Sequence, residues 1–173
     1  HNLYASNIAD LDKDGYLDIV LGAFAPPPNE TNAILVVYYG SQTGFTQERR
    51  AALPCEGRSS ICAIADFDKD SWLDIAVTSY EKDCIRIFQG GPQGFSEERQ
   101  KLLALPQPIE LETADLNADG WLDLVVGSYN DNIAHHQDTG LVIFWGGPDG
   151  FREWNAQWLP GMTPVGITVA DWD

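Results

Sequence analysis

The chain has 173 residues, of which 44% are hydrophobic, and it carries a formal net charge of −16 at pH 7. This composition is typical of a folded globular domain. The negative charge excludes nucleic acids and anionic membranes as expected partners, because both require a basic face. No apolar run approaches the roughly 18 residues that span a bilayer, so we expect no membrane insertion.

Reading from the N-terminus, the first conspicuous element is a nine-residue acidic segment, DLDKDGYLD at 10–18, which recurs along the chain. Related segments stand at 66–74 (DFDKDSWLD) and 115–123 (DLNADGWLD), and the chain stops at DWD, 171–173. Their starts are 49 to 56 residues apart, in the range expected for propeller blades or large solenoid repeats. Together they supply half of the 26 acidic residues. A second motif recurs with a similar spacing. Its copies are GSQTGF, GGPQGF and GGPDGF, which end at Phe45, Phe95 and Phe151.

Each repeat contains short apolar runs that predict β-strands and no helix. A run rich in Val, Ile and aromatic residues follows each acidic segment, and a second run ends in glycine, as in AILVVYYG at 33–40. A more polar stretch, such as FSEERQKLLAL at 95–105, reads as an outer strand, and a short run such as AIA at 63–65 precedes each acidic segment. Every repeat therefore predicts four strands.

Four antiparallel strands in about 50 residues predict an all-β fold built from propeller blades. The acidic segment then joins the first strand of a blade to the second. We expect blades at 4–54, 58–106 and 109–160 and the start of a fourth at 164–173. A closed propeller needs about four to eight blades, so we expect a piece of a longer propeller, packed against further blades of its parent protein or against other copies of the chain.

The spacing within the acidic segments predicts metal binding. Oxygen-bearing side chains stand at positions 1, 3, 5 and 9, with glycine at position 6 and an expected backbone carbonyl ligand at position 7, as in the first nine residues of an EF-hand loop. Hard oxygen donors without a His or Cys pattern favour calcium (Ca2+) over zinc or copper. The side-chain ligands expected for three structural calcium ions are Asp10, Asp12, Asp14 and Asp18; Asp66, Asp68, Asp70 and Asp74; and Asp115, Asn117, Asp119 and Asp123, with carbonyls from Tyr16, Trp72 and Trp121.

Two of the acidic segments depart from this pattern. Ser71 replaces the glycine of the second segment, at a cost of about 1 kcal/mol if that residue needs a positive φ, so we expect the second segment to lose its ion first. Asn117 removes one charge from the third segment. Asp171 and Asp173 form only half a site, and we expect no tight binding there.

The acidic segments, together with GSY at 127–129 and the GGPQGF marker at 90–95, resemble the FG-GAP/VCBS repeats of the integrin alpha-chain type of propeller. The resemblance covers nearly the whole chain. It implies calcium between the first and second strands of a blade, in extracellular proteins of adhesion, carbohydrate binding or associated enzymes. It therefore implies a secreted or cell-surface module that binds a protein or a glycan.

Recognition is expected on the connections after the second strand of each repeat, at 25–33, 81–83 and 130–140, because loops on a rigid scaffold carry most binding residues. The alternative is the propeller part of a secreted enzyme, such as a carbohydrate-active lyase. Its acid or base residues would be His135, His136 and Asp138, which otherwise read as a solvated loop.

The cysteines and one tripeptide bear on the compartment of the protein. Cys55 and Cys62 flank a short segment and could form a disulfide, which would leave Cys84 alone; the other interpretation is three buried reduced thiols. Asn29 begins NET, an acceptor sequence for N-glycosylation.

Overall fold

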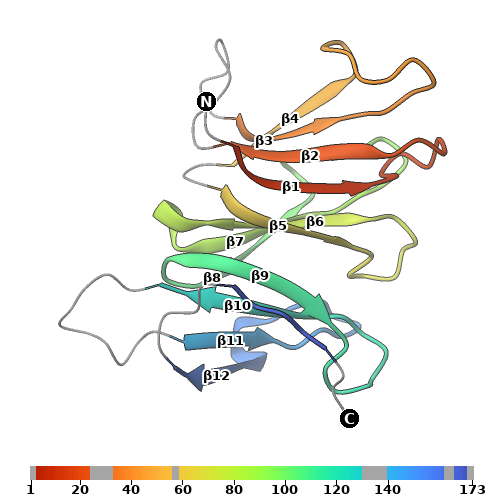
Figure 1. Cartoon of the computed structure of the whole chain (residues 1–173). Coiled ribbons are helices and arrows are strands. Elements are labelled where there is room, and N and C mark those ends of the chain that lie inside the picture. The colour runs from red at the N-terminus through yellow and green to blue at the C-terminus, as the bar shows by residue number, and fades with distance from the viewer. Residues whose placement is uncertain (1–2, 24–32, 56–58, 130–139, 162–165, 171–173) are drawn as a thin grey trace.

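The computed structural model describes residues 3–23, 33–55, 59–129, 140–161 and 166–170, and it has three four-stranded antiparallel sheets (Figure 1). The strands of each sheet follow the chain order, so each sheet is an up-and-down meander. Short 3-10 turns, Tyr80–Lys82 and Glu153–Asn155, are the helical segments of the described residues. The strands are β1 Leu3–Ala9, β2 Asp18–Ala23, β3 Ala33–Tyr38 and β4 Arg50–Pro54; β5 Ser59–Ala65, β6 Asp74–Ser79, β7 Cys84–Phe88 and β8 Gln100–Ala104; and β9 Pro108–Ala114, β10 Asp123–Ser128, β11 Gly140–Phe144 and β12 Ala156–Pro160. The predicted all-β class with four antiparallel strands in each repeat is confirmed.

Each acidic segment connects the first strand of a sheet to the second. The last residue of the segment is also the first residue of the second strand, where it pairs with the residue that precedes the segment. These pairs are Ala9 with Asp18, Ala65 with Asp74, and Ala114 with Asp123. The segment is therefore the loop of a β-hairpin, and strand pairing holds its two ends together.

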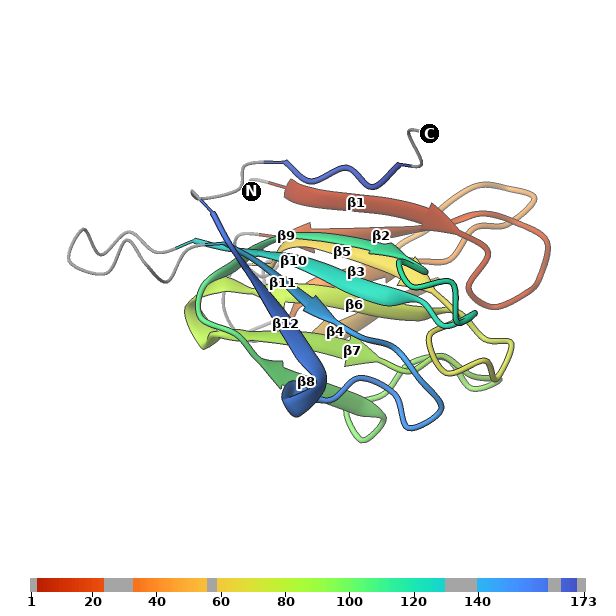
Figure 2. The ribbon, with the colours of Figure 1, turned by 90° about the horizontal axis from the view of Figure 1, so that it is seen from below.

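The three sheets pack face to face in sequence order, as Figure 1 shows from one side and Figure 2 from below. Their first strands meet, because β5 contacts both β1 and β9. Each junction between two sheets contains a separate apolar layer. Val20, Leu35 and Phe88 lie fully buried in the layer between the first two sheets, and Leu103 and Phe144 lie in the layer between the second and third.

The segment that the sequence assigns to the start of a fourth repeat does not pair as a strand in its described part, residues 166–170. Its residues alternate between exposed and half-buried, and the backbone of Gly166 lies within hydrogen-bonding reach of Glu110 in β9. A strand is stabilised by its neighbours in a sheet, and the described residues include no second strand of a fourth repeat.

The structure has Cys55, Cys62 and Cys84 as buried reduced thiols, so the alternative disulfide between Cys55 and Cys62 is not formed. Burial raises the pKa of the Cys62 thiol to about 12. A thiol of this kind packs as a small hydrophobic side chain and is unreactive. No helix in the described ranges is long and apolar enough to cross a membrane.

Candidate metal centres

The acidic segments fold into three loops with the same internal hydrogen bonds: loop one (10–18), loop two (66–74) and loop three (115–123). The first aspartate of each loop accepts the backbone N–H of the sixth residue through its Oδ2, over 3.0 Å from Gly15, 2.9 Å from Ser71 and 2.8 Å from Gly120. The aspartate at the fifth position accepts the backbone N–H of the seventh residue, at 2.7 to 2.9 Å. Short acidic side chains thus satisfy the donors of a tight turn.

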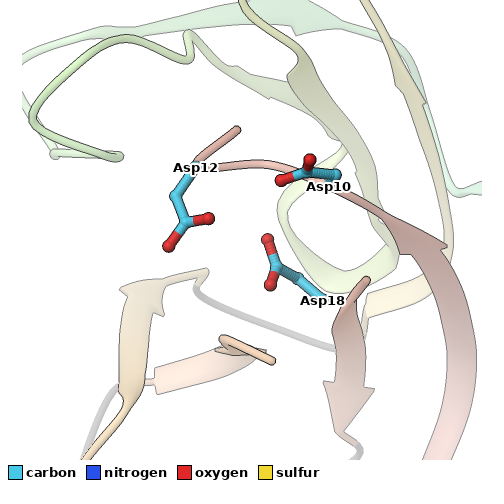
Figure 3. Close-up of side chains that lie close together, drawn as sticks. All are labelled: Asp10, Asp12 and Asp18. Carbon is cyan, nitrogen blue, oxygen red and sulfur yellow. The ribbon is translucent and has the colours of Figure 1, made fainter. Parts of the chain in front are cut away.

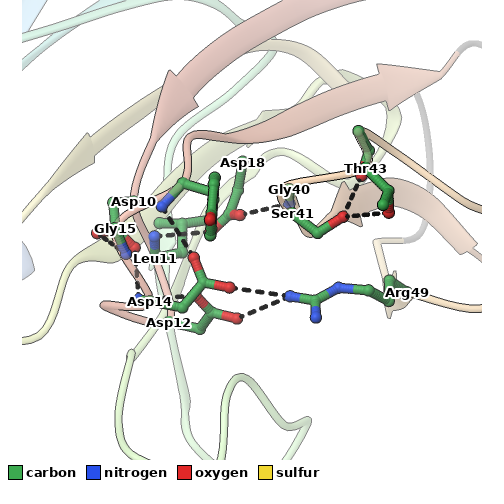
Figure 4. A network of polar contacts seen from close by, with 12 residues as sticks. Asp10, Leu11, Asp12, Asp14, Gly15, Asp18, Gly40, Ser41, Thr43 and Arg49 are labelled. Carbon is green, nitrogen blue, oxygen red and sulfur yellow. Dashed lines mark hydrogen bonds and ion pairs between the residues drawn. The ribbon is translucent and has the colours of Figure 1, made fainter.

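The ninth residue ties each loop to the end of the third strand of its sheet. Asp18, Asp74 and Asp123 have almost fully buried side chains, and each uses both carboxylate oxygens to accept backbone N–H groups. In loop one the donors are Leu11, at 2.7 Å, and Gly40, at 2.8 Å, which follows β3 (Figure 4). The same two bonds recur in the other loops, from Phe67 and Gly90 to Asp74 and from Leu116 and Gly146 to Asp123.

A glycine is required where the third strand meets the loop. A Cβ atom added to Gly40, Gly90 or Gly146 would lie 2.2 to 2.3 Å from the carbonyl oxygen of the eighth loop residue, which is backbone and cannot turn aside. From the sequence, the run that ends in glycine is predicted only as a strand. The structure shows that this glycine lets the third strand approach the loop closely enough to donate its N–H to the buried aspartate.

Two adjacent glycines allow a matched test of this requirement. We expect Gly146→Ala to lower the free energy of unfolding by about 1–3 kcal/mol, the usual cost of overpacking, because its new Cβ would meet the Leu122 carbonyl. Gly147→Ala is the control, since nothing lies within 4 Å of a Cβ at that position, and we expect a change within about 0.5 kcal/mol. Urea unfolding of both variants measures the difference, and equal values would contradict the steric argument.

Carboxylate groups converge at the first, third and ninth positions of loops one and two. One oxygen from each of Asp10, Asp12 and Asp18 lies within 4.8 Å of the others (Figure 3), and Asp66, Asp68 and Asp74 form a second group of this kind. Calcium binds oxygen at about 2.3–2.6 Å, so two ligands of one ion lie at most about 5 Å apart. The geometry of both groups therefore fits a single shared cation.

Loop two holds a carboxylate oxygen that needs a positive partner. Asp66 Oδ1 is buried and has no hydrogen-bond partner, although a buried charged oxygen is costly unless it is paired. Burial, together with the charges of Asp68 and Asp70, raises the pKa of Asp74 to about 6, although the N–H bonds from Gly90 and Phe67 lower it. A cation would favour the charged form of these groups. The donor set of loop two therefore fits a hard divalent ion.

The structure does not bring the fifth position into these groups. Asp14 Oδ2 instead accepts a hydrogen bond from Arg49 at 3.0 Å, and Asp119 Oδ2 accepts one from the amide of Asn117 at 3.0 Å. The backbone N–H of Asp119 in turn donates to two oxygens, Oδ1 of Asn117 and Oδ1 of Asp115. The backbone carbonyls of Tyr16, Trp72 and Trp121 stay predicted ligands, as do the side chains of Asp70, Asp115 and Asp123.

Sequence reasoning missed residues that surround the loops. Lys13 Nζ lies 4.2 Å from the ring centre of Trp72, and Lys69 Nζ lies 4.1 Å from that of Trp121, so each lysine contacts the next loop along the chain. Gln89 donates to Asp68 Oδ2 at 3.0 Å. A signal for the cation–π contacts was present, since lysine occupies the fourth position of loops one and two, and tryptophan the seventh position of loops two and three.

The sixth residue of each loop has a positive φ, which confirms that Ser71 occupies a glycine position. The angle is 75° at Ser71, against 89° at Gly15 and 84° at Gly120. We expect Ser71→Gly to raise the free energy of unfolding by about 1 kcal/mol. Gly15→Ser is the reverse control, because a Cβ there has nothing within 4 Å and only backbone strain is added. Thermal unfolding compares the two, and a loss of stability in Ser71→Gly would show that the serine is not strained.

Several predicted features lie outside the described residues. These are His135, His136 and Asp138 of the alternative enzyme site, Asn29 of the glycosylation sequence, and Asp171 and Asp173 of the incomplete acidic segment.

Comparison with known proteins identifies the repeats. A model of the FG-GAP-like repeat matches three overlapping segments, residues 10–77, 66–126 and 115–173, which together include all three loops. The chain belongs to the FG-GAP repeat family.

Two relatives carry the same name. The chain is 33% identical over 96 residues to integrin alpha-6 of Gallus gallus and 36% identical over 90 residues to integrin alpha-6 of Homo sapiens. These matches cover 52% and 50% of the chain but only 8% and 7% of the relatives. The matched part is thus less than a tenth of each relative's length.

Proposed function

We propose that the chain is part of a calcium-stabilised β-propeller that works outside the cell as a module for binding a protein or a glycan, in adhesion or in assembly. The observation that carries the proposal is the recurrence of one loop geometry in three FG-GAP repeats, with converging carboxylates in loops one and two. The similarity to two integrin alpha-6 chains supports the extracellular setting and the role in adhesion.

The calcium ions have a structural role in this proposal. All predicted ligands of one ion come from a single loop, and the ninth residue of that loop is bonded to the end of the third strand. An ion held in this way neutralises carboxylates that repel one another and fixes the hairpin to the neighbouring strand. Its binding free energy then adds to the stability of the folded state.

We propose that each sheet is one blade and that further blades cover the two open ends of the stack. A comparison of side-chain exposure at equivalent positions of the sheets supports an uncovered face on the third sheet. The second loop residue is 3% and 4% exposed at Leu11 and Phe67 but 40% at Leu116. In the outer strand, Leu103 is 1% exposed and Leu159 is 38%. Each residue is buried where another sheet follows and exposed where none does.

The face of the first sheet shows the same effect at the other end. Phe151 of the GGPDGF marker is 3% exposed because it packs against Phe67 of the preceding sheet, with ring centres 5.5 Å apart. The equivalent Phe45 is 48% exposed, and Ile8 in β1 is 58% exposed. We therefore propose that the partners of both faces are blades of the same parent protein or other copies of this chain.

Association through the open faces is the measurable consequence. We expect sedimentation of the chain at micromolar concentration to show association, because apolar side chains on both faces remain uncovered. Leu116→Asp with Leu159→Asp is expected to reduce this association. Leu102→Asp is the control, since Leu102 is an exposed leucine of the second sheet. A monodisperse monomer that binds no apolar dye would contradict the proposal.

A further inference from the structure

We propose that Arg49 is a counter-charge for the carboxylates of loop one, so that loop one holds its calcium ion more weakly than loop two does and depends less on that ion for its stability. The inference rests on the proposed function, in which the loops bind calcium. It concerns a residue outside the loops, which sets the affinity of one site without being a ligand.

Arg49 approaches the carboxylates that a cation would use. Its Nη2 lies 3.0 Å from Asp14 Oδ2 and 3.7 Å from Asp12 Oδ2 (Figure 4). Asp12 belongs to the converging group of loop one. A guanidinium keeps its charge at all ordinary pH values and presents several donors in a planar fork. It therefore neutralises part of the carboxylate cluster from one side.

The other repeats place different groups at the position of Arg49, which is four residues after the phenylalanine of the marker. In the second repeat Arg99 donates to the backbone carbonyls of Gly90 and Gly94 and forms no ion pair with a carboxylate of loop two. In the third repeat the position is Asn155, which is neutral. Within the described parts of the chain, the ion pairs to a loop carboxylate are those of Arg49 in loop one.

Loop two has the opposite arrangement. Its third-position aspartate receives a neutral hydrogen bond from Gln89, at 3.0 Å. Its first aspartate keeps a buried oxygen, Asp66 Oδ1, without a partner. In the part of the chain that the structure describes, no ion pair reaches a carboxylate of loop two, so these carboxylates rely on a bound ion.

The sign of the effect follows from Coulomb's law. A divalent ion among Asp10, Asp12 and Asp18 would lie near the guanidinium and be repelled by it. For partly exposed groups in water this repulsion amounts to roughly a three- to tenfold loss of affinity, and salt reduces it. Without the ion, the same guanidinium attracts the carboxylates and stabilises the loop. This ordering differs from the one expected from Ser71 alone, because the partner of loop one comes from a distant part of the chain.

Calcium titration of the whole chain by calorimetry tests the inference with Arg49→Gln. The variant is expected to tighten one site roughly three- to tenfold, and less so at high salt. It is also expected to lower the melting temperature in chelator. Arg50→Gln is the matched control, because it removes the same charge from the next residue and should leave every affinity within about twofold. In an Asp10→Asn background, where loop one is disabled, the gain from Arg49→Gln should disappear.

The outcomes separate this inference from the proposed function. Calcium binding with an unchanged or weaker first site in Arg49→Gln would overturn the role of Arg49 and leave the calcium sites standing. A gain that survives in the Asp10→Asn background would place the effect at another loop and also overturn it. Absence of calcium binding at every loop of the wild-type chain would instead refute the proposed function.

Discussion

Removal of calcium is expected to lower the melting temperature of the chain by about 10 °C or more. An ion present at a hundred times its dissociation constant stabilises a folded protein by about 2.7 kcal/mol, so two or three filled loops contribute about 5–8 kcal/mol. In a chain of this size, 1 kcal/mol shifts the melting temperature by about 2–4 °C. Scanning calorimetry in calcium and in chelator measures the shift.

Magnesium is the control for this experiment. It holds its water shell tightly and requires near-octahedral geometry, so it is expected to restore much less of the melting temperature than calcium does. Recognition of a partner should change less than stability, because the loops and the proposed recognition connections are different segments. A melting temperature that is the same in calcium and in chelator would contradict the structural role of the loops.

Asp18→Ala is expected to destabilise the chain even when no calcium is present. The substitution leaves the buried N–H groups of Leu11 and Gly40 without acceptors. Each such group costs about 1–3 kcal/mol, so we expect a loss of about 2–6 kcal/mol in the free energy of unfolding. Urea unfolding in chelator measures the intrinsic cost, separately from any lost ion.

Asp12→Ala provides the contrast, because Asp12 is an exposed member of the same converging group. The N–H that it accepts, from Asp14, also bonds to Asp10. We expect a change of less than about 1 kcal/mol in chelator and a loss of calcium binding at loop one comparable to that of Asp18→Ala. Equal destabilisation of the two variants in chelator would show that the ninth residue is a ligand only and does not tie the loop to the sheet.

Local patterns were sufficient to predict the repeats and the strands. The carboxylates that converge in loops one and two stand at three of the predicted ligand positions, the first, third and ninth. The contacts of the fifth residue could not be predicted from spacing. The orientation of Asp14 depends on Arg49, which is 35 residues away in the chain. The spacing of Asp14 in the loop predicts a calcium ligand, whereas in the structure its Oδ2 accepts a hydrogen bond from Arg49.

Packing within and between repeats was also beyond local patterns. The need for glycine at Gly146 comes from the carbonyl of Leu122 on the neighbouring strand connection, and glycine before a turn has commoner explanations. The different exposure of Leu103 and Leu159 depends on which sheet follows each of them. The contact between Lys13 and Trp72 joins successive repeats. It is visible in the sequence only when the fourth residue of one loop is compared with the seventh residue of the next loop.

The central claim, that the acidic loops are structural calcium sites, is tested most directly by counting the ions that the chain binds. Calorimetric titration of metal-free chain with calcium is predicted to show three sites, with the melting temperature rising as they fill. Asp68→Ala should remove one site, because it takes away an exposed member of the loop two group. A titration without saturable calcium binding, or with binding that leaves the melting temperature unchanged, would contradict the account.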